Sequence, residues 1–229
     1  MRRLQAMSGD ITDMKIAAVV MAGGRSSRMA GRHKGMLLTP EGVTFTERLA
    51  AEMHKFTDLV YVSYGDTIQM EAAGCEIVRD IYKGCGPVGG LHAVLTRALA
   101  DGAAAVAAAA CDMPYVTMEL YRYLYTQLAD CAEFDDDRKN PFDLYDGAVA
   151  VTGGRIHPLA AVYSVGAVCI FKTQLEEGNL RVRDALAKLR ILYVDLDGTA
   201  YERMILNINT EEDYTEYFGG HAALPAGPI

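Results

Sequence analysis

An apolar stretch close to the start of the chain, followed at once by two glycines, constrains the fold more than any other feature. Residues 16–21 (Ile-Ala-Ala-Val-Val-Met) are apolar without alternation, which is typical of a strand buried on both faces in a parallel sheet covered by helices. Gly23 and Gly24 then remove Cβ atoms where backbone N–H groups would approach a large anion, and Ser26 and Ser27 add hydroxyl donors. This stretch predicts a strand followed by an anion-binding loop.

The charge of the same loop opposes the charge of the whole chain. Arg25, Arg28, Arg32 and Lys34 lie within one short stretch of a chain whose net charge is −8. This local reversal of sign predicts a polyphosphate ligand. The spacing matches neither the P-loop nor the Gly-x-Gly-x-x-Gly dinucleotide motif. On the glycines alone, an ordinary loop remains an alternative.

The loop also carries a family resemblance. The pattern Ala22-Gly23-Gly24-x-Ser26-x-Arg28-Met29 with Lys34 resembles the signature of nucleotidyltransferases with a Rossmann-like fold, and is most similar to that of the molybdenum-cofactor guanylyltransferases. The resemblance implies a single α/β domain with a mostly parallel central sheet and helices on both faces. It also implies that a loop wraps the nucleotide triphosphate, with contacts from Met21, Ala22, Gly23, Gly24, Arg25, Ser26 and Lys34.

Length and composition agree with one domain and a small partner. The chain has 229 residues, 51% of them hydrophobic, which suits one α/β domain over 15–218 with a flexible leader at 1–14 and a tail at 219–229. A membrane span is not expected, because no apolar run reaches the required length, and a signal peptide is not expected, because polar residues follow Met1-Arg2-Arg3. We therefore expect a cytoplasmic protein. The five cysteines include no Cys-x-x-Cys pair, which argues against disulfides and zinc. The acidic total argues against nucleic acid.

Polar residues follow the next predicted strands. Residues 59–63 end at Ser63, where relatives commonly carry asparagine, and residues 76–78 lead to Asp80. A helix capped by Thr44 or Thr46 precedes them. Polar residues at strand ends form the ligand-facing edge of an open α/β sheet. We therefore assign Ser63 and Asp80 to the nucleotide site.

A second glycine-rich stretch spans residues 84–91 and leads into a helix. Such an entry offers free N–H groups to a ligand. On these residues alone, however, a tight loop with close packing is the slightly better explanation of the glycines. Gly86-Pro87-x-x-Gly90 resembles the family's second motif, at the base and ribose of the nucleotide. The resemblance therefore places Gly86 and Pro87 in the nucleotide site.

Asp112 is the candidate metal ligand. The alanine-rich residues 103–110 favour a helix by intrinsic propensity, but only a strand here keeps the βαβ order regular. Asp112 would then emerge at the strand's carboxyl end, where Mg²⁺ takes one or two carboxylates with phosphate oxygens. The alternative is an N-cap of the helix expected from Thr117. In the resembling family, Asp-x-Pro at this point holds the metal.

Fewer features of the C-terminal half indicate chemistry. Residues 133–143 are charged and predict a solvated insertion. A hairpin turns at Gly153-Gly154 and continues into a strand that begins at His157. His157 either terminates this strand or, as the resemblance implies, lies near the acceptor. Arg181, before a short helix, is either a solvated side chain or an acceptor ligand.

The last motif is Asn207-Ile208-Asn209-Thr210. Residues 191–194 and 204–206 are strand candidates, and Thr210 with Asp213 has the spacing of a capping box for a final helix. Asn207 and Asn209 alternate on an extended segment, so both amides would face one ligand. In the resembling family this segment lies at the pterin-binding end, away from the phosphate loop.

These features predict a nucleotide site with Mg²⁺ on Asp112, and the resemblance implies transfer of GMP from GTP to the terminal phosphate of molybdopterin. Lys34, Arg28 and Asp112 would be catalytic, and Arg25 would help to stabilise the departing pyrophosphate. Molybdoenzymes or their chaperones would receive the product. Two alternatives remain: a transferase that uses CTP or another phosphorylated acceptor, and a non-catalytic nucleotide-binding regulator. Gly23 argues against the use of CTP, since cytidylyltransferases usually carry alanine at this position.

Overall fold

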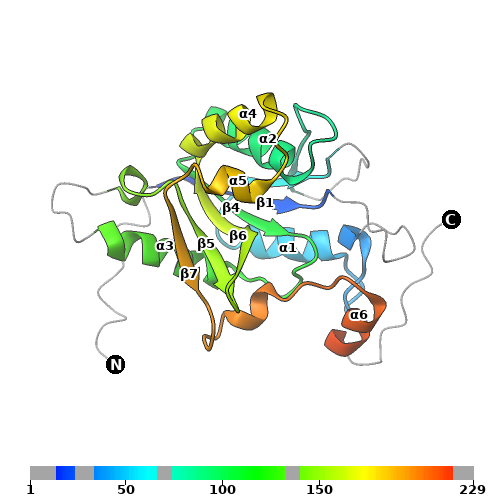
Figure 1. Cartoon of the computed structure of the whole chain (residues 1–229). Coiled ribbons are helices and arrows are strands. Elements are labelled where there is room, and N and C mark those ends of the chain that lie inside the picture. The colour runs from blue at the N-terminus through cyan, green and yellow to red at the C-terminus, as the bar shows by residue number, and fades with distance from the viewer. Residues whose placement is uncertain (1–13, 24–33, 66–73, 133–139, 219–229) are drawn as a thin grey trace.

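A computed structural model of the chain describes residues 14–23, 34–65, 74–132 and 140–218. Its centre is a seven-stranded sheet of order β3-β2-β1-β4-β6-β5-β7 (Figure 1). β6 runs antiparallel to its two neighbours, β4 and β5, and the other paired strands are parallel. The strands are β1 (Ile16–Met21), β2 (Val60–Ser63), β3 (Glu76–Val78), β4 (Ala105–Ala110), β5 (Gly147–Thr152), β6 (Arg155–Ser164) and β7 (Ile191–Asp195). The predicted mostly parallel α/β architecture is confirmed.

Helices cover both faces of this sheet. In Figure 1, α2, α4 and α5 lie above it, α1 and α3 lie below it, and α6 lies at the lower right. The helices are α1 (Phe45–Met53), α2 (Gly86–Ala100), α3 (Met118–Ala132), α4 (Val168–Glu176), α5 (Val182–Leu186) and α6 (Glu211–Phe218). Short 3-10 helices occur at η2 (Lys34–Met36), η3 (Pro141–Asp143), η4 (Val165–Ala167) and η5 (Glu202–Ile205). No helix within the described ranges has the length and apolar character that crossing a bilayer requires.

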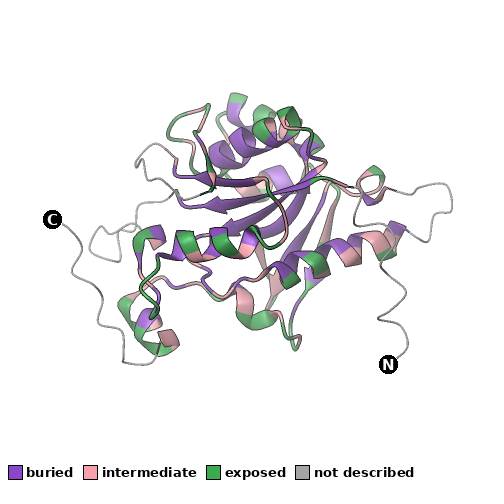
Figure 2. Ribbon diagram, turned by 180° about the vertical axis from the view of Figure 1, so that it is seen from behind, coloured by how far each residue is buried: buried purple, intermediate pink, exposed green. Residues whose placement is uncertain are grey.

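Successive residues of the central strands supply two separate cores. Ala18 and Val20 of β1 belong to the core under α1 and α3, whereas Ala17 and Val19 belong to the core under α2, α4 and α5. Side chains alternate across a strand, so a strand without polar residues is covered on both sides. Figure 2 shows these central strands as buried. This burial on both faces explains why residues 16–21 are apolar without alternation.

The alanine-rich segment is a strand, as predicted. β4 lies between β1 and β6, and its residues from Ala105 to Ala109 are buried to 1% exposure or less. Small side chains let α3 approach closely, and the Tyr121 hydroxyl donates to the carbonyl of Ala108 at 2.9 Å. Tertiary packing therefore overrides the helix propensity of alanine here.

Three predictions about local structure are wrong in detail. α2 already begins at Gly86, so the Gly-Pro pair lies in its first turn, which suits proline because the first N–H groups of a helix have no internal partner. Residues 204–206 form no strand, because η5 covers most of them. In the predicted solvated insertion, 133–139 lie outside the described residues, while Pro141 is buried and Phe142 contacts Tyr125 at 6.2 Å between ring centroids.

Candidate active site

The parallel strands β1, β2 and β4 end at one edge of the sheet. Met21 is aligned with Ser63 of β2 and with Ala110 of β4. The ladder continues one residue further, since Ala22 N–H donates to the Ser63 carbonyl at 2.7 Å and Cys111 N–H donates to the Met21 carbonyl at 3.1 Å. Residues after the strands therefore begin side by side, as expected for the ligand edge of an α/β sheet.

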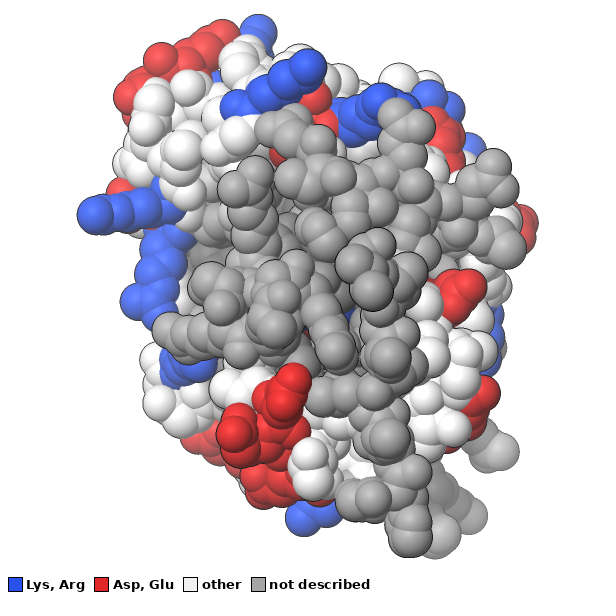
Figure 3. All heavy atoms as spheres, turned by 90° about the vertical axis from the view of Figure 1, so that its right-hand side faces the viewer, with Lys and Arg blue, Asp and Glu red and all other residues white. Residues whose placement is uncertain are grey.

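Figure 3 views the face of the molecule toward which β1 points. Lys and Arg side chains lie along its top and left side, and Asp and Glu side chains form one group below the centre and another at the upper left. Predicted site residues Gly24, Arg25, Ser26 and Arg28 lie outside the described residues.

Gly23 allows the loops after β1 and β2 to touch. A Cβ on Gly23 would lie 3.2 Å from the Gly65 nitrogen and from the Tyr64 carbonyl carbon and oxygen. Gly65 itself has a φ of 66°, in the left-handed region that favours glycine. The predicted importance of Gly23 therefore has a structural cause: backbone approaches backbone here.

The glycines of α2 make a second close approach. A Cβ on Gly90 would lie 2.6 Å from the Met21 methyl and 3.0 Å from the Ser63 hydroxyl oxygen, and one on Gly89 would lie 3.3 Å from the Asp80 carboxylate. Met21, Ser63 and Asp80 are thereby brought together against one helix face. Ser63 is only 1% exposed, so a nucleotide contact from its side chain stays a prediction.

The predicted motif Gly86-Pro87 forms the start of this helix. Gly86 has a φ of 56°, and the preceding Cys85 makes no side-chain capping hydrogen bond. The first turn of a helix presents N–H groups without intrahelical partners and a partial positive charge. The segment therefore suits a polar or anionic ligand group, and a contact of Gly86 and Pro87 with the nucleotide stays a prediction.

Lys34, Asp112 and Asn209 meet although they are far apart in the chain. The Lys34 ammonium donates to Asp112 Oδ2 at 2.8 Å and also to Asn209 Oδ1. The Lys34 and Asp112 side chains are 21% and 16% exposed. The structure thus joins the predicted phosphate lysine and the predicted metal ligand in a partly buried ion pair.

The second oxygen of Asp112 is the best candidate for holding a cation. Oδ1 is buried and accepts no hydrogen bond from any described residue, and a buried carboxylate oxygen without a partner is unfavourable. Asp112 does not cap α3 in the described contacts, since the N–H at Met118 donates to Glu52 Oε1 at 3.3 Å. The described ranges contain no cluster of three His, Cys, Asp or Glu ligands. One carboxylate suits Mg²⁺, which binds through one or two carboxylates and the oxygens of substrate phosphates.

Asn209 reaches this pair because two contacts fix its backbone. Ile208 N–H donates to the Asp112 carbonyl at 2.8 Å. Asp213 Oδ2 accepts from the N–H groups of Asn209 and Thr210 at 2.7 and 3.0 Å. Asp213 N–H in turn donates to the Thr210 hydroxyl at 3.0 Å, so the predicted capping box is confirmed.

The predicted separation of this segment from the phosphate lysine is wrong. Asn209 contacts Lys34 itself. Asn207 has a buried Oδ1 that accepts no hydrogen bond from the described residues. The Asp213 carboxylate fills the first turn of α6, so that helix end offers little to an anionic ligand.

His157 lies at the same edge, because β6 runs opposite to β4 and pairs Ala160 with Ala109. Its Nε2 lies 2.8 Å from the Thr152 hydroxyl, and burial lowers the pKa of His157 below its usual range. Burial likewise raises the pKa of Cys111 to about 12, so this thiol is neutral at physiological pH. The imidazole of His157 is therefore an uncharged, hydrogen-bonded group rather than a cation.

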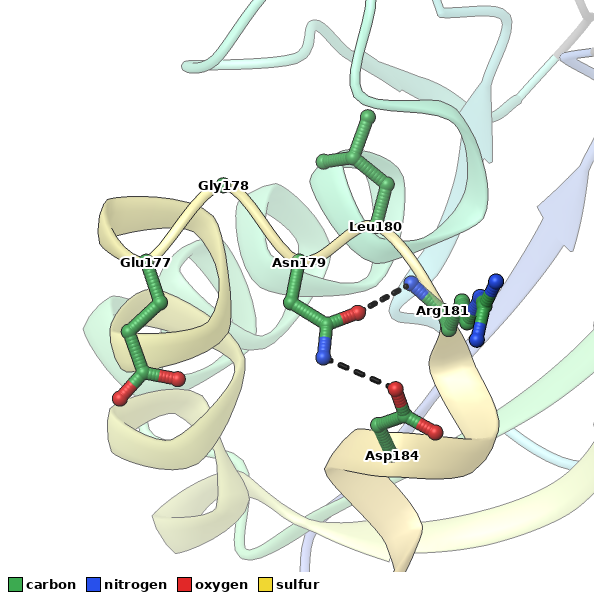
Figure 4. Close-up of a pocket in the computed structure, with 6 residues that line it drawn as sticks. All are labelled: Glu177, Gly178, Asn179, Leu180, Arg181 and Asp184. Carbon is green, nitrogen blue, oxygen red and sulfur yellow. Dashed lines mark hydrogen bonds between the residues drawn. The ribbon is translucent and has the colours of Figure 1, made fainter.

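Arg181 belongs to a different part of the molecule. It lies at the start of α5, above the sheet in Figure 1, and lines a surface depression of about 510 Å³. Figure 4 shows its side chain pointing away from Asn179 and Asp184, which are joined by a 2.9 Å hydrogen bond. The described hydrogen bonds of Arg181 are made by its backbone: its N–H donates to Asn179, and its carbonyl accepts from Gln174 and from the N–H groups of Asp184 and Ala185. They do not link it to Lys34.

Gly65, which lines this edge, and the contact between Lys34 and Asn209 were not predicted from the sequence. Gly65 follows a predicted strand end in Ser63-Tyr64-Gly65, which is a signal for a turn. No sequence signal joins Lys34 to Asn209, because their contact depends on how α6 packs.

The strand order, the glycine-rich edge and the Lys34–Asp112 pair define a nucleotide-handling α/β enzyme fold. Comparison with known proteins gives its family: the description "MobA-like NTP transferase domain" matches residues 18–191. The chain belongs to this family and is a nucleotidyltransferase.

Individual relatives agree over nearly the full length. A "Probable molybdenum cofactor guanylyltransferase" of Pelotomaculum thermopropionicum is 30% identical over 204 residues, covering 87% of this chain and 90% of the relative. A "Molybdenum cofactor guanylyltransferase" of Syntrophotalea carbinolica is 29% identical over 208 residues, covering 88% and 90%. The crystal structure of molybdopterin-guanine dinucleotide biosynthesis protein A from Archaeoglobus fulgidus superposes with a TM-score of 0.69 at 23% identity, covering 89% of this chain and 96% of that one. The last likeness concerns the fold alone.

Proposed function

We propose that this chain transfers GMP from GTP to the terminal phosphate of molybdopterin in a Mg²⁺-dependent reaction and releases pyrophosphate. The single observation that carries the proposal is the Lys34–Asp112 pair at the carboxyl edge of the sheet, in a chain of the MobA-like NTP transferase family. The names of the relatives support guanylyl transfer over other nucleotidyl transfers.

The residues at this edge would have different roles that follow from their charges. Lys34 would bind phosphate oxygens as a point charge and stabilise the pyrophosphate as it leaves. Asp112 would hold the cation through Oδ1, and Mg²⁺, when bound, supplies positive charge at the reacting phosphate. The nucleophile is a phosphate that is already ionised at neutral pH. No side chain is therefore needed as a general base, and the neutral His157 and Cys111 are compatible with this reaction.

The remaining predicted roles are part of the same proposal. Met21 to Gly23, Asp80 and the Gly86-Pro87 turn would contact the nucleotide through backbone groups and a carboxylate. His157, Asn207, Asn209 and Arg181 would serve the acceptor. Asn207 and His157 lie on segments at the Asp112 edge, whereas an acceptor would have to extend to α5 to reach Arg181.

The first experiment incubates the purified chain with each of the four NTPs, Mg²⁺ and a source of molybdopterin, and measures pyrophosphate and the dinucleotide product. Formation of product with GTP and with none of the other three NTPs supports the proposal. Product with CTP supports the alternative transferase, and nucleotide binding without turnover supports a non-catalytic regulator.

Asp112→Asn tests the role of the carboxylate. The amide preserves side-chain volume but binds Mg²⁺ poorly, so turnover should fall on the order of 10²-fold or more, the scale for removing one electrostatic stabiliser. Asp130→Asn, on the exposed side of α3, is the matched control and should retain full activity. Full turnover by a folded Asp112→Asn protein would contradict the assignment.

A further inference from the structure

The Lys34 ammonium is held from two sides. Asp112 provides a charged acceptor at 2.8 Å, and Asn209 provides a neutral amide oxygen from the opposite end of the chain. An ammonium has three donors, so two of them are engaged in the described contacts. Both anchors are partly buried, which strengthens the interaction relative to an exposed pair.

This arrangement bears on how a cation reaches Asp112. A divalent cation on Oδ1 would share one carboxylate with the Lys34 ammonium on Oδ2. Two positive charges on the two oxygens of one carboxylate repel each other strongly in a partly buried site. A nucleotide triphosphate relieves the conflict, because its phosphates attract Lys34 away from Asp112 and themselves contribute oxygen ligands to the cation.

Asn209 is suited to hold the Lys34 ammonium temporarily. Its position is fixed by the Asp213 carboxylate on its own N–H and by the adjacent Ile208–Asp112 backbone bond. Its amide carries no charge, and hydrogen bonds between a charged and a neutral group are weaker than those between two charges. Lys34 can therefore be drawn from Asn209 by a phosphate more readily than from a second carboxylate.

We propose that Asn209 is a positioning residue that keeps the Lys34 ammonium on Asp112 in the nucleotide-free protein, so that Lys34 and a divalent cation bind Asp112 in competition and the cation enters with the nucleotide. The inference rests on the proposed function for the identity of the nucleotide and the cation. The competition itself concerns Lys34, Asp112 and Asn209 alone.

The test measures Mn²⁺ binding to the full chain without nucleotide, by electron paramagnetic resonance and calorimetry. Lys34→Met keeps most of the side-chain volume and removes the charge, so Mn²⁺ should bind at least about tenfold tighter than to the wild type, the scale of a lost half-buried ion pair. Asn209→Ala should tighten Mn²⁺ binding about twofold or more, because Lys34 is held less firmly. Asp112→Asn should abolish this binding.

Lys188→Met is the matched control, because Lys188 pairs with Glu177 on the surface, and it should leave Mn²⁺ affinity unchanged. Unchanged or weaker Mn²⁺ binding by Lys34→Met overturns the competition. Weaker Mn²⁺ binding by a folded Asn209→Ala protein overturns the positioning role and makes Asn209 a metal ligand or a structural residue. Turnover with GTP and molybdopterin is measured separately, so a failure of the proposed function is seen in that assay and not in the Mn²⁺ titration.

Discussion

Replacing Gly23 with alanine probes a close contact between two backbone segments of the candidate site. The new Cβ would lie 3.2 Å from three backbone atoms of Tyr64 and Gly65, whereas ordinary contacts begin some tenths of an ångström further out. Backbone atoms cannot rotate away as the end of a side chain can. The loops after β1 and β2 must therefore separate, and inserting a methyl group into a packed site typically costs about 1–3 kcal/mol.

A loss of that size is measurable as unfolding free energy and as thermal midpoint. In a domain of this length, 1 kcal/mol corresponds to a change of roughly 2–4 °C in Tm, so we expect a decrease of several degrees. Gly166→Ala is the matched control, because a Cβ there meets the Ser164 hydroxyl oxygen at 3.5 Å, an ordinary contact. It should leave the Tm nearly unchanged.

The same variant tests the nucleotide site. If the backbone after β1 contacts the nucleotide, separating the loops should weaken GTP binding in a titration by more than the Gly166→Ala control does. A Gly23→Ala protein as stable as Gly166→Ala, with wild-type GTP affinity, would refute both the steric argument and the placement of the nucleotide at Gly23.

Two further predictions concern stability. Tyr214→Phe should lower the unfolding free energy by about 1–2 kcal/mol in a urea titration, because it removes the 2.8 Å hydrogen bond from the Tyr214 hydroxyl to the Leu38 carbonyl. Tyr123→Phe, on a partly buried ring stacked against Tyr201, is the control. Burial lowers the pKa of His92 and of His157 in the folded state, so the unfolded chain binds more protons as the pH falls below about 6.5, and stability is highest above that pH and decreases under it. The urea midpoint should therefore decrease as the pH is lowered from 7.5 to 5.5. The decrease should be smaller in His92→Gln than in His54→Gln, the control at an exposed site, and an equal dependence of the midpoint on pH in both variants would contradict the prediction.

The sheet was predictable from local pattern wherever burial dictates composition. Residues 16–21 lie in the centre of the sheet, so both faces are apolar and the pattern is unmistakable. The alanines of β4 required an argument about βαβ order, because their propensity indicates the wrong element. Residues 204–206 were assigned wrongly, because a short apolar run fits a strand and a 3-10 turn equally well.

For the candidate site, the sequence predicted which strand ends carry the site residues but not which side chains contact one another. Asp112 and Ser63 were placed at strand ends, and the register bears out those positions. The partner of Asp112 was not predictable, since nothing in residues 207–210 specifies a contact with Lys34. That contact depends on the packing of α6 against Leu37 and α1, which involves aromatic contacts between residues far apart in the chain.

These aromatic contacts give the C-terminal helix a direct influence on the lysine. Phe45 of α1 and Tyr214 of α6 are buried in one small core, and their rings stack at 6.4 Å between centroids. The Tyr214 hydroxyl donates a hydrogen bond to the carbonyl of Leu38, which lies shortly after Lys34 in the chain. Tyr214 also follows Asn209 by little more than one helical turn. The same tyrosine therefore fixes the chain on both sides of the Lys34–Asn209 contact. Because this core is small, a defect in it should loosen α6 before it unfolds the sheet. Lys34 would then lose Asn209 and be held less firmly on Asp112.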